Sequence, residues 1–494
     1  MFQVRKIDEV SLQITSPDDS GSIRELAEHF TFFAEGYKFM PSYRNKVWDG
    51  KIRLFNIRNN TLPAGLFQHV IDFADERGYE CDIDDSILLG GVTKKNIDEF
   101  ISELPLCVNG ERIEARDYQI DAVKHALLNE RAVLVSPTGS GKSLIIYILI
   151  RWFLENFDKK ALIVVPTTSL VEQMYKDFLD YASEDKWFDE DDMHRIYSGK
   201  EKINLDQRVI ITTWQSIFKL PKQWFSDYGL VVGDEAHNFK AKSLNSIMSK
   251  LSNAKLRFGT TGTLDGSQVH ELVLEGNFGP VYKVTTTKKL MDEDTLAQMK
   301  IESLVIKYSD QTRKEFGKKK YQEEIDYIVS HEKRNNFIKN LALDQKGNTL
   351  VLYNLVEKHG KPLHELIMKA AGKRKVFYVS GSVNADEREK IREITEKEKD
   401  AIIVASVGTF STGINIRNLH NIIFASPTKS QVRVLQSIGR GLRKSDNGQI
   451  TVVYDLADDL SWKKRKNYTL NHAIERVKIY AREKFNFQTH EVPL

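Results

Sequence analysis

Cysteine, net charge and long apolar runs are all scarce in this sequence, and each shortage excludes a class of protein. The 494 residues include two cysteines, Cys81 and Cys107, which give neither a disulfide framework nor the spacing of a metal site. The densest apolar run, residues 144–153, is interrupted by Arg151 and falls far short of a membrane span. Charged side chains occupy the N-terminus, where a signal peptide would need an apolar core. We therefore expect a cytoplasmic protein without a signal or transmembrane segment.

The net charge is only +3, so any nucleic-acid binding would have to use local basic patches. Hydrophobic residues make up 41% of the chain and charged residues 29%, which is ordinary for a globular protein. A chain of 494 residues is too long for one core and predicts about two to four domains.

Two sets of short apolar runs alternate with helical stretches from about residue 113 onward. The first set is 132–135, 161–165, 209–211, 230–232 and 256–258, and the second is 349–353, 376–379, 402–405, 422–425 and 451–454. Continuous apolar runs indicate strands that are covered on both faces, hence parallel sheets with crossover helices. The sequence thus predicts an α/β fold with two parallel-sheet domains, a polar connector at about 284–300, and a basic tail, helical in pattern, from Ser461.

A glycine-rich loop follows the run at 132–135 and precedes a helical pattern. Its members are Ser136, Pro137, Thr138, Gly139, Ser140, Gly141, Lys142 and Ser143. In a strand–loop–helix context the backbone N–H groups hold phosphate, Lys142 would reach the β- and γ-phosphates, and Ser143 would be a ligand of Mg²⁺. Ser136 stands where the usual pattern has glycine, and such a cluster is also compatible with an ordinary turn. The loop therefore predicts a nucleotide site that needs support from the rest of the chain.

Two adjacent carboxylates, Asp234 and Glu235, follow the run at 230–232. At the carboxyl edge of a parallel sheet, beside a phosphate loop, Asp234 would hold Mg²⁺ while Glu235 would orient and deprotonate the attacking water. A lone acidic pair is usually surface charge, so this assignment depends on the buried strand that precedes it.

Side chains on other segments also suit a nucleotide. Gln119 can both donate to and accept from the edge of adenine, with Arg116 near the base, although this signal is weak alone. The corresponding edge of the second sheet would contribute Gly413, Asn415, Arg440 and Arg443. Two arginines three residues apart share one face of a helix and would stabilise the charge that develops on the γ-phosphoryl group.

Aromatic and basic residues interleave from about residue 30 to residue 55. The basic ones are Lys38, Arg44, Lys46, Lys51 and Arg53. Asp49-Gly50 is a two-residue hairpin signal, after which Lys51 and Arg53 would share one face of a strand. Such a face suits a phosphate backbone. The alternative is that the aromatic side chains form core and the charges are merely solvated, and the pattern alone does not decide.

Together these segments resemble the motifs of superfamily 2 helicases over about residues 115–445. S-P-T-G-S-G-K-S resembles motif I, P-T-T-S-L motif Ia, D-E-A-H motif II, T-G-T motif III, S-T-G-I-N motif V and Q-S-I-G-R-G-L-R motif VI, and R-D-Y-Q resembles the adenine-reading motif. The resemblance implies ATP and Mg²⁺ as cofactors and accounts for Ser136, which is common in that superfamily. It also implies that His237 belongs to the catalytic set and that Thr167, Thr213 and Trp214 contact nucleic acid.

The N-terminal region resembles the UvsW family of phage recombination and repair helicases. That family carries F-x-A-[DE]-G-Y-x-F-x-P and W-D-G-[KR]-I-R-L stretches, which correspond here to residues 32–41 and 48–54. The resemblance implies an N-terminal domain that contacts duplex DNA. It further implies work on branched DNA, namely branch migration, fork regression and the unwinding of DNA or RNA–DNA hybrids.

We therefore expect a small α+β N-terminal domain at 1–110 and two RecA-like lobes at 111–290 and 291–494, with ATP in the cleft between the lobes of a monomer. ATP binding would draw the lobes together and hydrolysis would release them, which would move DNA held across both. Three alternatives stay open from the sequence: a duplex translocase of the restriction type that does not separate strands, a nucleotide-gated DNA-binding switch, and an RNA helicase.

Overall fold

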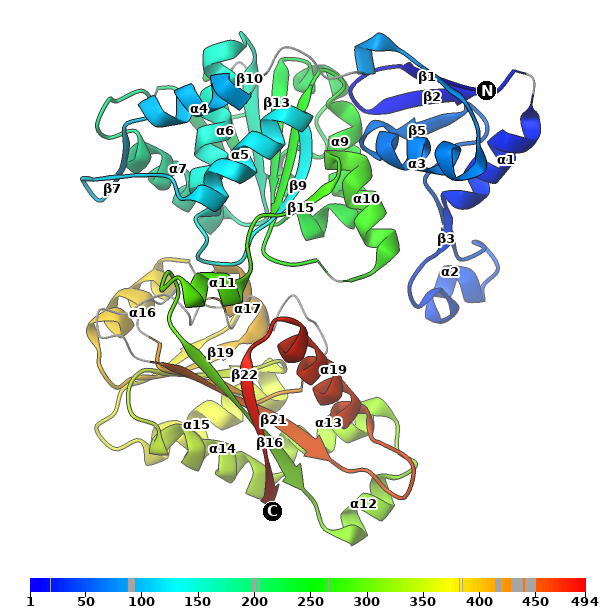
Figure 1. The fold of residues 1–494 in the computed structure, drawn as a ribbon. Helices are drawn as coiled ribbons and strands as arrows, with labels where there is room; N and C mark the ends of the chain where they lie inside the picture. The colour runs from blue at the N-terminus through cyan, green and yellow to red at the C-terminus, as the bar shows by residue number, and fades with distance from the viewer. Residues whose placement is uncertain are drawn as a thin grey trace. The chain divides into compact units, whose positions relative to one another are not determined.

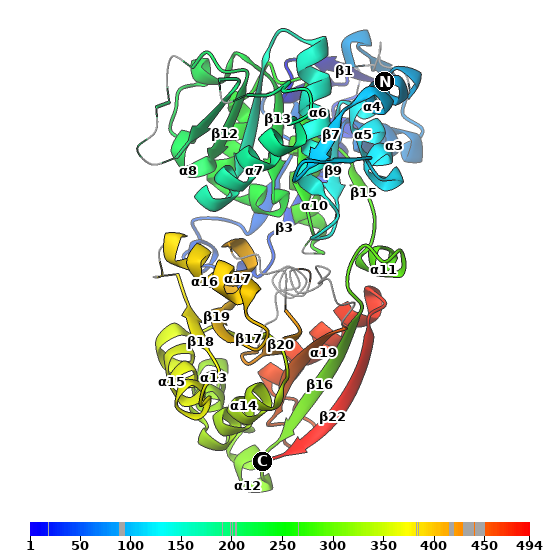
Figure 2. The ribbon, with the colours of Figure 1, turned by 90° about the vertical axis from the view of Figure 1, so that its left-hand side faces the viewer.

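The computed structural model describes residues 1–17, 19–87, 94–189, 191–197, 199, 201–202, 205–264, 266–381, 383, 385–413, 419–427, 439 and 450–494. They form two compact units, which are Met1–Ser136 with Gly141–Val284, and Thr285–Leu494 with Pro137–Ser140. Each unit contains one large twisted sheet flanked by helices (Figures 1 and 2). No helix in the described part of the chain is long and apolar enough to cross a bilayer.

A seven-stranded parallel sheet forms the core of the first unit. Its strands, in spatial order, are β11 Met193–Ile196, β12 Val209–Thr213, β10 Lys160–Val165, β13 Tyr228–Asp234, β14 Leu256–Thr261, β9 Arg131–Val135 and β15 Val281–Lys283. The five apolar runs predicted as strands are confirmed. The two outermost strands, β11 and β15, were not predicted, because their runs are short and mixed with polar residues.

Helices cover both faces of this sheet, as parallel strands require. They are α4 Lys94–Glu103, α5 Asp117–Asn129, α6 Lys142–Asn156, α7 Thr168–Tyr181, α8 Trp214–Ile217, α9 Lys242–Lys250 and α10 Gln268–Phe278. A small antiparallel pair, β7 Leu106–Val108 and β8 Glu111–Ile113, precedes α5. Helix α6 is buried from Leu144 to Phe153, a stretch in which Arg151 is the one charged residue, so the helix that follows the glycine-rich loop lies within the core.

The N-terminal part of the first unit has a four-stranded sheet of its own. Its strands, in spatial order, are β5 Thr61–Pro63, β2 Ser11–Thr15, β1 Phe2–Lys6 and β6 Cys81–Ile83, and its helices are α1 Ser20–His29 and α3 Phe67–Arg77. A second, two-stranded sheet pairs β3 Thr31–Phe33 with β4 Lys51–Arg53. The predicted two-residue hairpin at Asp49-Gly50 is wrong. The whole stretch 34–50, with helix α2 Pro41–Arg44, connects these strands, and Gly50 (φ +81°) only ends it.

The four-stranded sheet and its helices pack on the seven-stranded sheet through partly buried charges and a glycine. The guanidinium of Arg131, at the start of β9, donates to the backbone oxygen of Glu9 at 2.7 Å and to its carboxylate at 2.8 Å. A Cβ on Gly65 would lie 1.9 Å from the backbone oxygen of Glu275, so only glycine allows this approach. His69 Nε2 lies 2.8 Å from the carboxylate of Glu275 in α10.

The His69–Glu275 contact leads to a prediction about pH. The hydrogen bond to Glu275 raises the pKa of His69 above its ordinary value of 6.5, against the opposing effect of partial burial. The pair therefore stabilises the fold fully below pH 6.5, and that stabilisation is lost as the pH rises through the pKa of the folded state. Histidine NMR titration should give a pKa above 6.5 for His69, and Glu275→Gln should lower it. An unchanged pKa in that variant would show that Glu275 is not the cause.

The second unit contains another seven-stranded sheet. Its strands, in spatial order, are β18 Val376–Val379, β19 Ile402–Ser406, β17 Thr349–Tyr353, β20 Asn421–Phe424, β21 Thr451–Asp459, β16 Met299–Lys307 and β22 Asn486–Pro493. All its described pairings are parallel. Its helices are α11 Thr287–Asp292, α12 Asp310–Phe316, α13 Tyr321–Ser330, α14 Glu332–Asp344, α15 Lys361–Ala370, α16 Ala385–Lys397, α17 Val407–Gly413 and α19 Tyr468–Arg482.

The ends of this unit differ from the sequence prediction. The predicted connector at 284–300 contains α11 and the start of β16, and the tail predicted as helical continues after α19 into β22. Strand β22 lies on the edge of the sheet, and its residues are exposed except for the partly buried Phe487 and Val492. That position explains why no continuous apolar run marks it.

Candidate ATP site and helicase core

The glycine-rich loop lies between β9 and α6, as predicted. Gly139 and Gly141 have φ values of +85° and +79°, a region that side chains with a Cβ rarely occupy. Lys142 is the first residue of α6, and its ammonium group donates to the backbone oxygen of Ser136 at 3.0 Å. The hydroxyl of Ser143 lies 2.8 Å from that of Tyr181 at the end of α7. Tyr181 is a contact that sequence patterns did not reveal.

The predicted adenine-reading residues begin helix α5. Gln119 is buried, and its side-chain oxygen accepts the backbone N–H of Arg116 at 2.9 Å. Its amide nitrogen would lie 2.4 Å from a Cβ on Gly141, so Gln119 packs directly against the end of the phosphate loop. The guanidinium of Arg116 donates to the hydroxyl of Tyr118 at 2.9 Å. Folding thus brings Gln119, at the start of α5, beside Gly141 of the loop, which lies 22 residues further along the chain.

The carboxylate pair lies at the carboxyl end of β13, the same edge of the parallel sheet from which the loop leaves β9. Asp234 is buried, and one of its oxygens accepts the hydroxyl of Thr260 in β14 at 2.8 Å. Burial raises the pKa of Asp234, the neighbouring Glu235 raises it further, and the Lys142 ammonium opposes both. An interaction between Asp234 and Lys142 is what a shared phosphate and metal site requires.

Glu235 has a left-handed backbone conformation, with φ 51° and ψ 51°. For a residue other than glycine this conformation costs on the order of 1–3 kcal/mol. Strand β13 ends at Asp234, and the turn at Glu235 places the two neighbouring carboxylates in different surroundings. Asp234 is inside the sheet edge, whereas the Glu235 carboxylate lies 3.4 Å from Nδ1 of His237.

His237 links the carboxylates to the neighbouring strand. Its Nδ1 lies 3.0 Å from the hydroxyl of Thr261, which in turn donates to the backbone oxygen of Thr263 at 2.9 Å. The backbone oxygen of Thr261 accepts the N–H of Ser136 at 2.8 Å. The T-G-T segment therefore contacts both the D-E-A-H segment and the first residue of the phosphate loop.

The donor set of this edge fits Mg²⁺. Magnesium in nucleotide sites is usually held by one or two protein oxygens together with substrate phosphates and water. A hydroxyl at Ser143 and a carboxylate at Asp234 meet that requirement, since both lie at the carboxyl edge of one sheet. No group of three or more histidine, cysteine or acidic side chains suited to a metal occurs among the described residues, so a dedicated multi-ligand metal centre is absent there.

The residues predicted for the second half of the site are only partly described. Gly413 is the last residue of α17, which follows β19 at the carboxyl edge of the second sheet. Asn415, Arg440 and Arg443 lie outside the described residues. Their assignments stay predictions.

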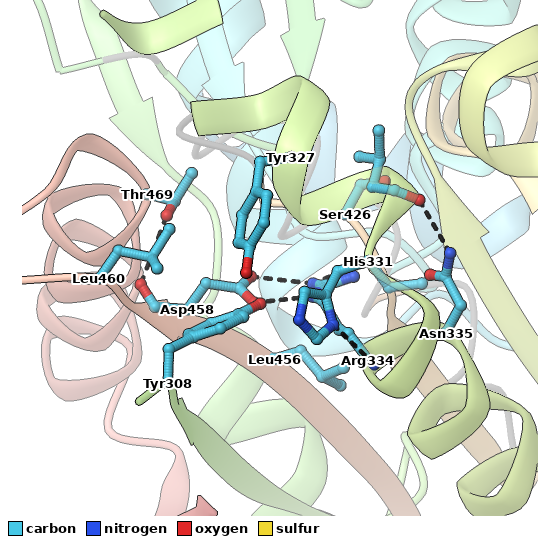
Figure 3. Close-up of polar contacts among 12 residues, drawn as sticks. Tyr308, Tyr327, His331, Arg334, Asn335, Ser426, Leu456, Asp458, Leu460 and Thr469 are labelled. Atoms are coloured by element: carbon cyan, nitrogen blue, oxygen red, sulfur yellow. Dashed lines mark hydrogen bonds and ion pairs between the residues drawn. The ribbon is translucent and has the colours of Figure 1, made fainter. Parts of the chain in front are cut away.

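A buried polar network holds the strand that leads to the arginine segment (Figure 3). Asp458 of β21 accepts from Arg334 of α14 at 2.7 and 2.9 Å and from the hydroxyl of Tyr308 at 2.8 Å. Arg334 also donates to the backbone oxygen of Ala425, at 2.9 Å. Arg334 and Asp458 are both fully buried, so the network fixes the end of β20 from inside the core.

A second set of contacts fixes the two residues that follow Ala425. Burial lowers the pKa of His359 to about 3, so its ring is neutral, and Nδ1 lies 2.8 Å from the hydroxyl of Ser426. The side-chain amide of Asn354 donates to the backbone oxygen of Pro427 at 3.0 Å. Ser426 and Pro427 are thus both held by side chains of the second unit.

Three residues predicted to contact nucleic acid, Thr167, Thr213 and Trp214, lie at the starts of helices α7 and α8. Thr167 is the N-cap of α7, where its hydroxyl accepts the N–H of Leu170 at 3.3 Å. Thr213 is buried at the end of β12, with its hydroxyl 2.9 Å from that of Ser216. Trp214 begins α8, and its ring lies edge-on to Phe218 and packs against the core. Their roles in DNA binding stay predictions.

The basic residues of the N-terminal region fall into two groups. Arg53 forms an ion pair with Asp49, and Lys51 lies over the ring of Phe33 at 5.3 Å, so both already have partners in the fold. Lys38, Arg44 and Lys46 are exposed. The alternative that the aromatic side chains form core is correct for some of them: Phe30 and Phe55 are buried.

Three known families match successive stretches of the chain. The family described as DNA helicase UvsW, N-terminal, matches residues 5–84. Type III restriction enzyme, res subunit, matches residues 112–266, and Helicase conserved C-terminal domain matches residues 332–445. These three matches correspond in order to the N-terminal region and the two motif-bearing regions of the sequence.

Individual relatives agree with these matches. The chain is 23% identical over 71% of its length to the DNA 3'-5' translocase XPB2 of Sulfurisphaera tokodaii, of which 84% is covered. The type ISP restriction-modification enzyme LlaBIII bound to DNA has a TM-score of 0.56 at 16% identity, covering 78% of this chain and 32% of that one, and shows the fold alone. The crystal structure of T4 UvsW has a TM-score of 0.53 at 37% identity, covering 100% of this chain and 99% of that one. The ATP-dependent DNA helicase uvsW of Enterobacteria phage T4 is 40% identical over 96% of this chain and 97% of its own length. With this identity over almost its full length, the chain belongs to the UvsW family of ATP-dependent DNA helicases.

Proposed function

We propose that this helicase couples ATP hydrolysis at the carboxyl edge of its first large sheet to movement along branched DNA. The observation that carries the proposal is the convergence of Lys142, Asp234 and Glu235 at that edge. In this proposal Lys142 and the loop N–H groups bind the β- and γ-phosphates, Asp234 and Ser143 hold Mg²⁺, and Glu235 takes the proton of the attacking water. Bound Mg²⁺ would neutralise charge on the phosphate oxygens.

The nucleotide base has a proposed site beside the loop. Gln119 is buried against Gly141, which supports a role for its amide in positioning the loop as well as in reading adenine. Arg440 and Arg443 are proposed to stabilise the transition-state charge, because arginine supplied to a transferring phosphoryl group accelerates reaction about a thousandfold or more.

The proposed substrate is forked or four-way DNA, or an RNA–DNA hybrid, with a monomer as the working form. Membership of the UvsW family supports a DNA substrate, and the exposed basic residues of the N-terminal region support an additional DNA contact outside the helicase core. Phosphate contacts by lysine and arginine release counterions, so DNA affinity should fall steeply with salt.

An ATPase titration tests this function. The chain is titrated with single-stranded, linear duplex, forked and four-way DNA and with an RNA–DNA hybrid, and strand displacement is followed in parallel. We expect ATPase stimulation by every DNA with a junction, greater than that by linear duplex of equal length, together with strand separation. Equal stimulation by linear duplex, with triplex displacement but no strand separation, would contradict the proposal and indicate a duplex translocase.

A further inference from the structure

The connection between β3 and β4 forms a small structured projection, which we call the N-terminal tip (residues 33–51). It contains one turn of 3-10 helix, Tyr37–Phe39, followed by α2. Backbone hydrogen bonds close it, with Ala34 donating to Gly50 at 2.8 Å and Val47 donating to Ser42 at 2.9 Å. Figure 1 shows β3 and α2 away from the four-stranded sheet of the same unit.

Aromatic side chains contact one another within the tip. The rings of Phe33, which is 52% exposed, and Tyr37 stack with centroids 4.6 Å apart, and Tyr43 meets Tyr37 edge-on at 4.8 Å. A Cβ on Gly50 would lie 2.4 Å from the ring of Tyr37, so the aromatic cluster sits directly on this glycine. The indole N–H of Trp48 donates to the backbone oxygen of Lys51 at 2.9 Å. The tip is therefore preorganised and does not need a partner to order it.

Two apolar side chains of the tip are open to solvent. Phe39 is 85% exposed and Val47 is 81% exposed, the two highest values among the large hydrophobic side chains of the described residues. Met40 beside them is 38% exposed. These side chains contribute almost nothing to the core, so they are available to a partner.

Three exposed cations lie in the same tip, and two of them are next in the chain to its exposed apolar residues. Lys38 precedes Phe39 and Lys46 precedes Val47, Arg44 lies between them in the chain, and none of the three forms an ion pair with a carboxylate among the described residues. Lys38 lies 5.8 Å from the centroid of the Tyr37 ring, on the outside of the aromatic cluster. Exposed apolar side chains that neighbour exposed cations in the chain complement an aromatic base face that is bordered by phosphates.

DNA offers such a surface only where base stacking ends. In a continuous duplex the faces of the base pairs are covered by their neighbours, and only groove edges and phosphates are exposed. At a fork or a four-way junction, a terminal base pair or an unpaired base has an uncovered face. Aromatic side chains stack on such faces without reading sequence.

We propose that the N-terminal tip recognises the end of base stacking at a DNA junction. Phe39 and Val47 cover the open base face, while Lys38, Arg44 and Lys46 hold the phosphates beside it. This inference rests on the proposed branched-DNA substrate and assigns the residues that distinguish a junction from continuous duplex. It differs from backbone binding, which would treat both DNAs alike.

The test compares Phe39→Ala with Ile57→Ala on two DNAs. Ile57 is a 52% exposed apolar residue of the same N-terminal region outside the tip, so Ile57→Ala controls for loss of exposed apolar surface. The probes are a fork with 2-aminopurine at its junction and a covalently closed duplex circle, which has no end and therefore no uncovered base face. We expect Phe39→Ala to weaken fork binding roughly tenfold, the usual effect of losing one stacked aromatic, with less than about a twofold effect on duplex. The 2-aminopurine signal change should disappear, and Ile57→Ala should match the wild type.

Substitutions of the exposed lysines give an independent readout. Lys38→Ala and Lys46→Ala should each weaken fork and duplex binding similarly and lower the salt slope of log K by about one. Equal losses of fork and duplex binding in Phe39→Ala, or no loss, would overturn the junction role. A changed sedimentation coefficient of DNA-free Phe39→Ala would also overturn it, since the tip would then be an interface between copies of the chain. A wild-type chain without preference for the fork would instead contradict the proposed substrate.

Discussion

Glu235→Gln is expected to lower the kcat of DNA-stimulated ATP hydrolysis by about a thousandfold while ATP binding stays near the wild-type level. A general base contributes roughly 10²- to 10⁴-fold, and glutamine keeps the shape of the side chain but cannot take the proton of water. The phosphate loop and Lys142 are untouched, so the contacts expected to bind the triphosphate remain. Steady-state ATPase with saturating DNA measures the first effect, and equilibrium binding of a fluorescent ATP analogue measures the second.

Glu130→Gln is the matched control for this variant. Glu130 lies in the same unit, and like Glu235 it is a glutamate with a left-handed backbone, at φ 58°. Its carboxylate pairs with Lys255 at 2.7 Å, at the end of α5 far along the chain from the D-E-A-H segment. Glutamine at 130 should leave kcat unchanged. Normal turnover in Glu235→Gln, or equal losses in both variants, would remove Glu235 as the base.

Asp458→Ala is expected to destabilise the second unit by roughly 3–5 kcal/mol, because it leaves the guanidinium of Arg334 buried without its counter-charge. Arg334 already has one buried guanidinium nitrogen, Nη1, without a partner, so nothing nearby replaces the lost carboxylate. Asp326→Ala is the control. That carboxylate pairs with Lys358 at 2.8 Å on the surface, and losing such a pair costs less than about 1 kcal/mol. Urea unfolding of both variants measures the difference.

Replacing both members of the buried pair refines this test. Arg334→Met combined with Asp458→Leu should be clearly more stable than Asp458→Ala, since no charge then stays buried alone. If the double variant lost as much free energy of unfolding as Arg334→Met and Asp458→Leu lose together when made singly, packing around Tyr308, and not uncompensated charge, would determine the loss.

Sequence patterns were reliable where one buried strand leads directly to a chemically distinctive segment. The strand–loop–helix order around Lys142 and the strand before Asp234 are confirmed as elements, because continuous apolar runs and glycine at positive φ are local requirements. Patterns failed where polar edges or long connections intervene. Edge strand β22 carries no apolar run, and Asp49-Gly50 closes a structured connection in place of a tight hairpin.

The sequence by itself determined the two parallel-sheet units, the phosphate loop and the carboxylate pair, since each depends on the order of residues within a short segment. Only the tertiary structure decided which distant side chains meet. It placed Gln119 against Gly141, Tyr181 on Ser143, Thr261 on His237, and Arg334 on Asp458. These contacts join residues that are remote in the chain and become neighbours only when strands align at one edge of a sheet. No local pattern records that alignment, because it is set by the packing of whole elements.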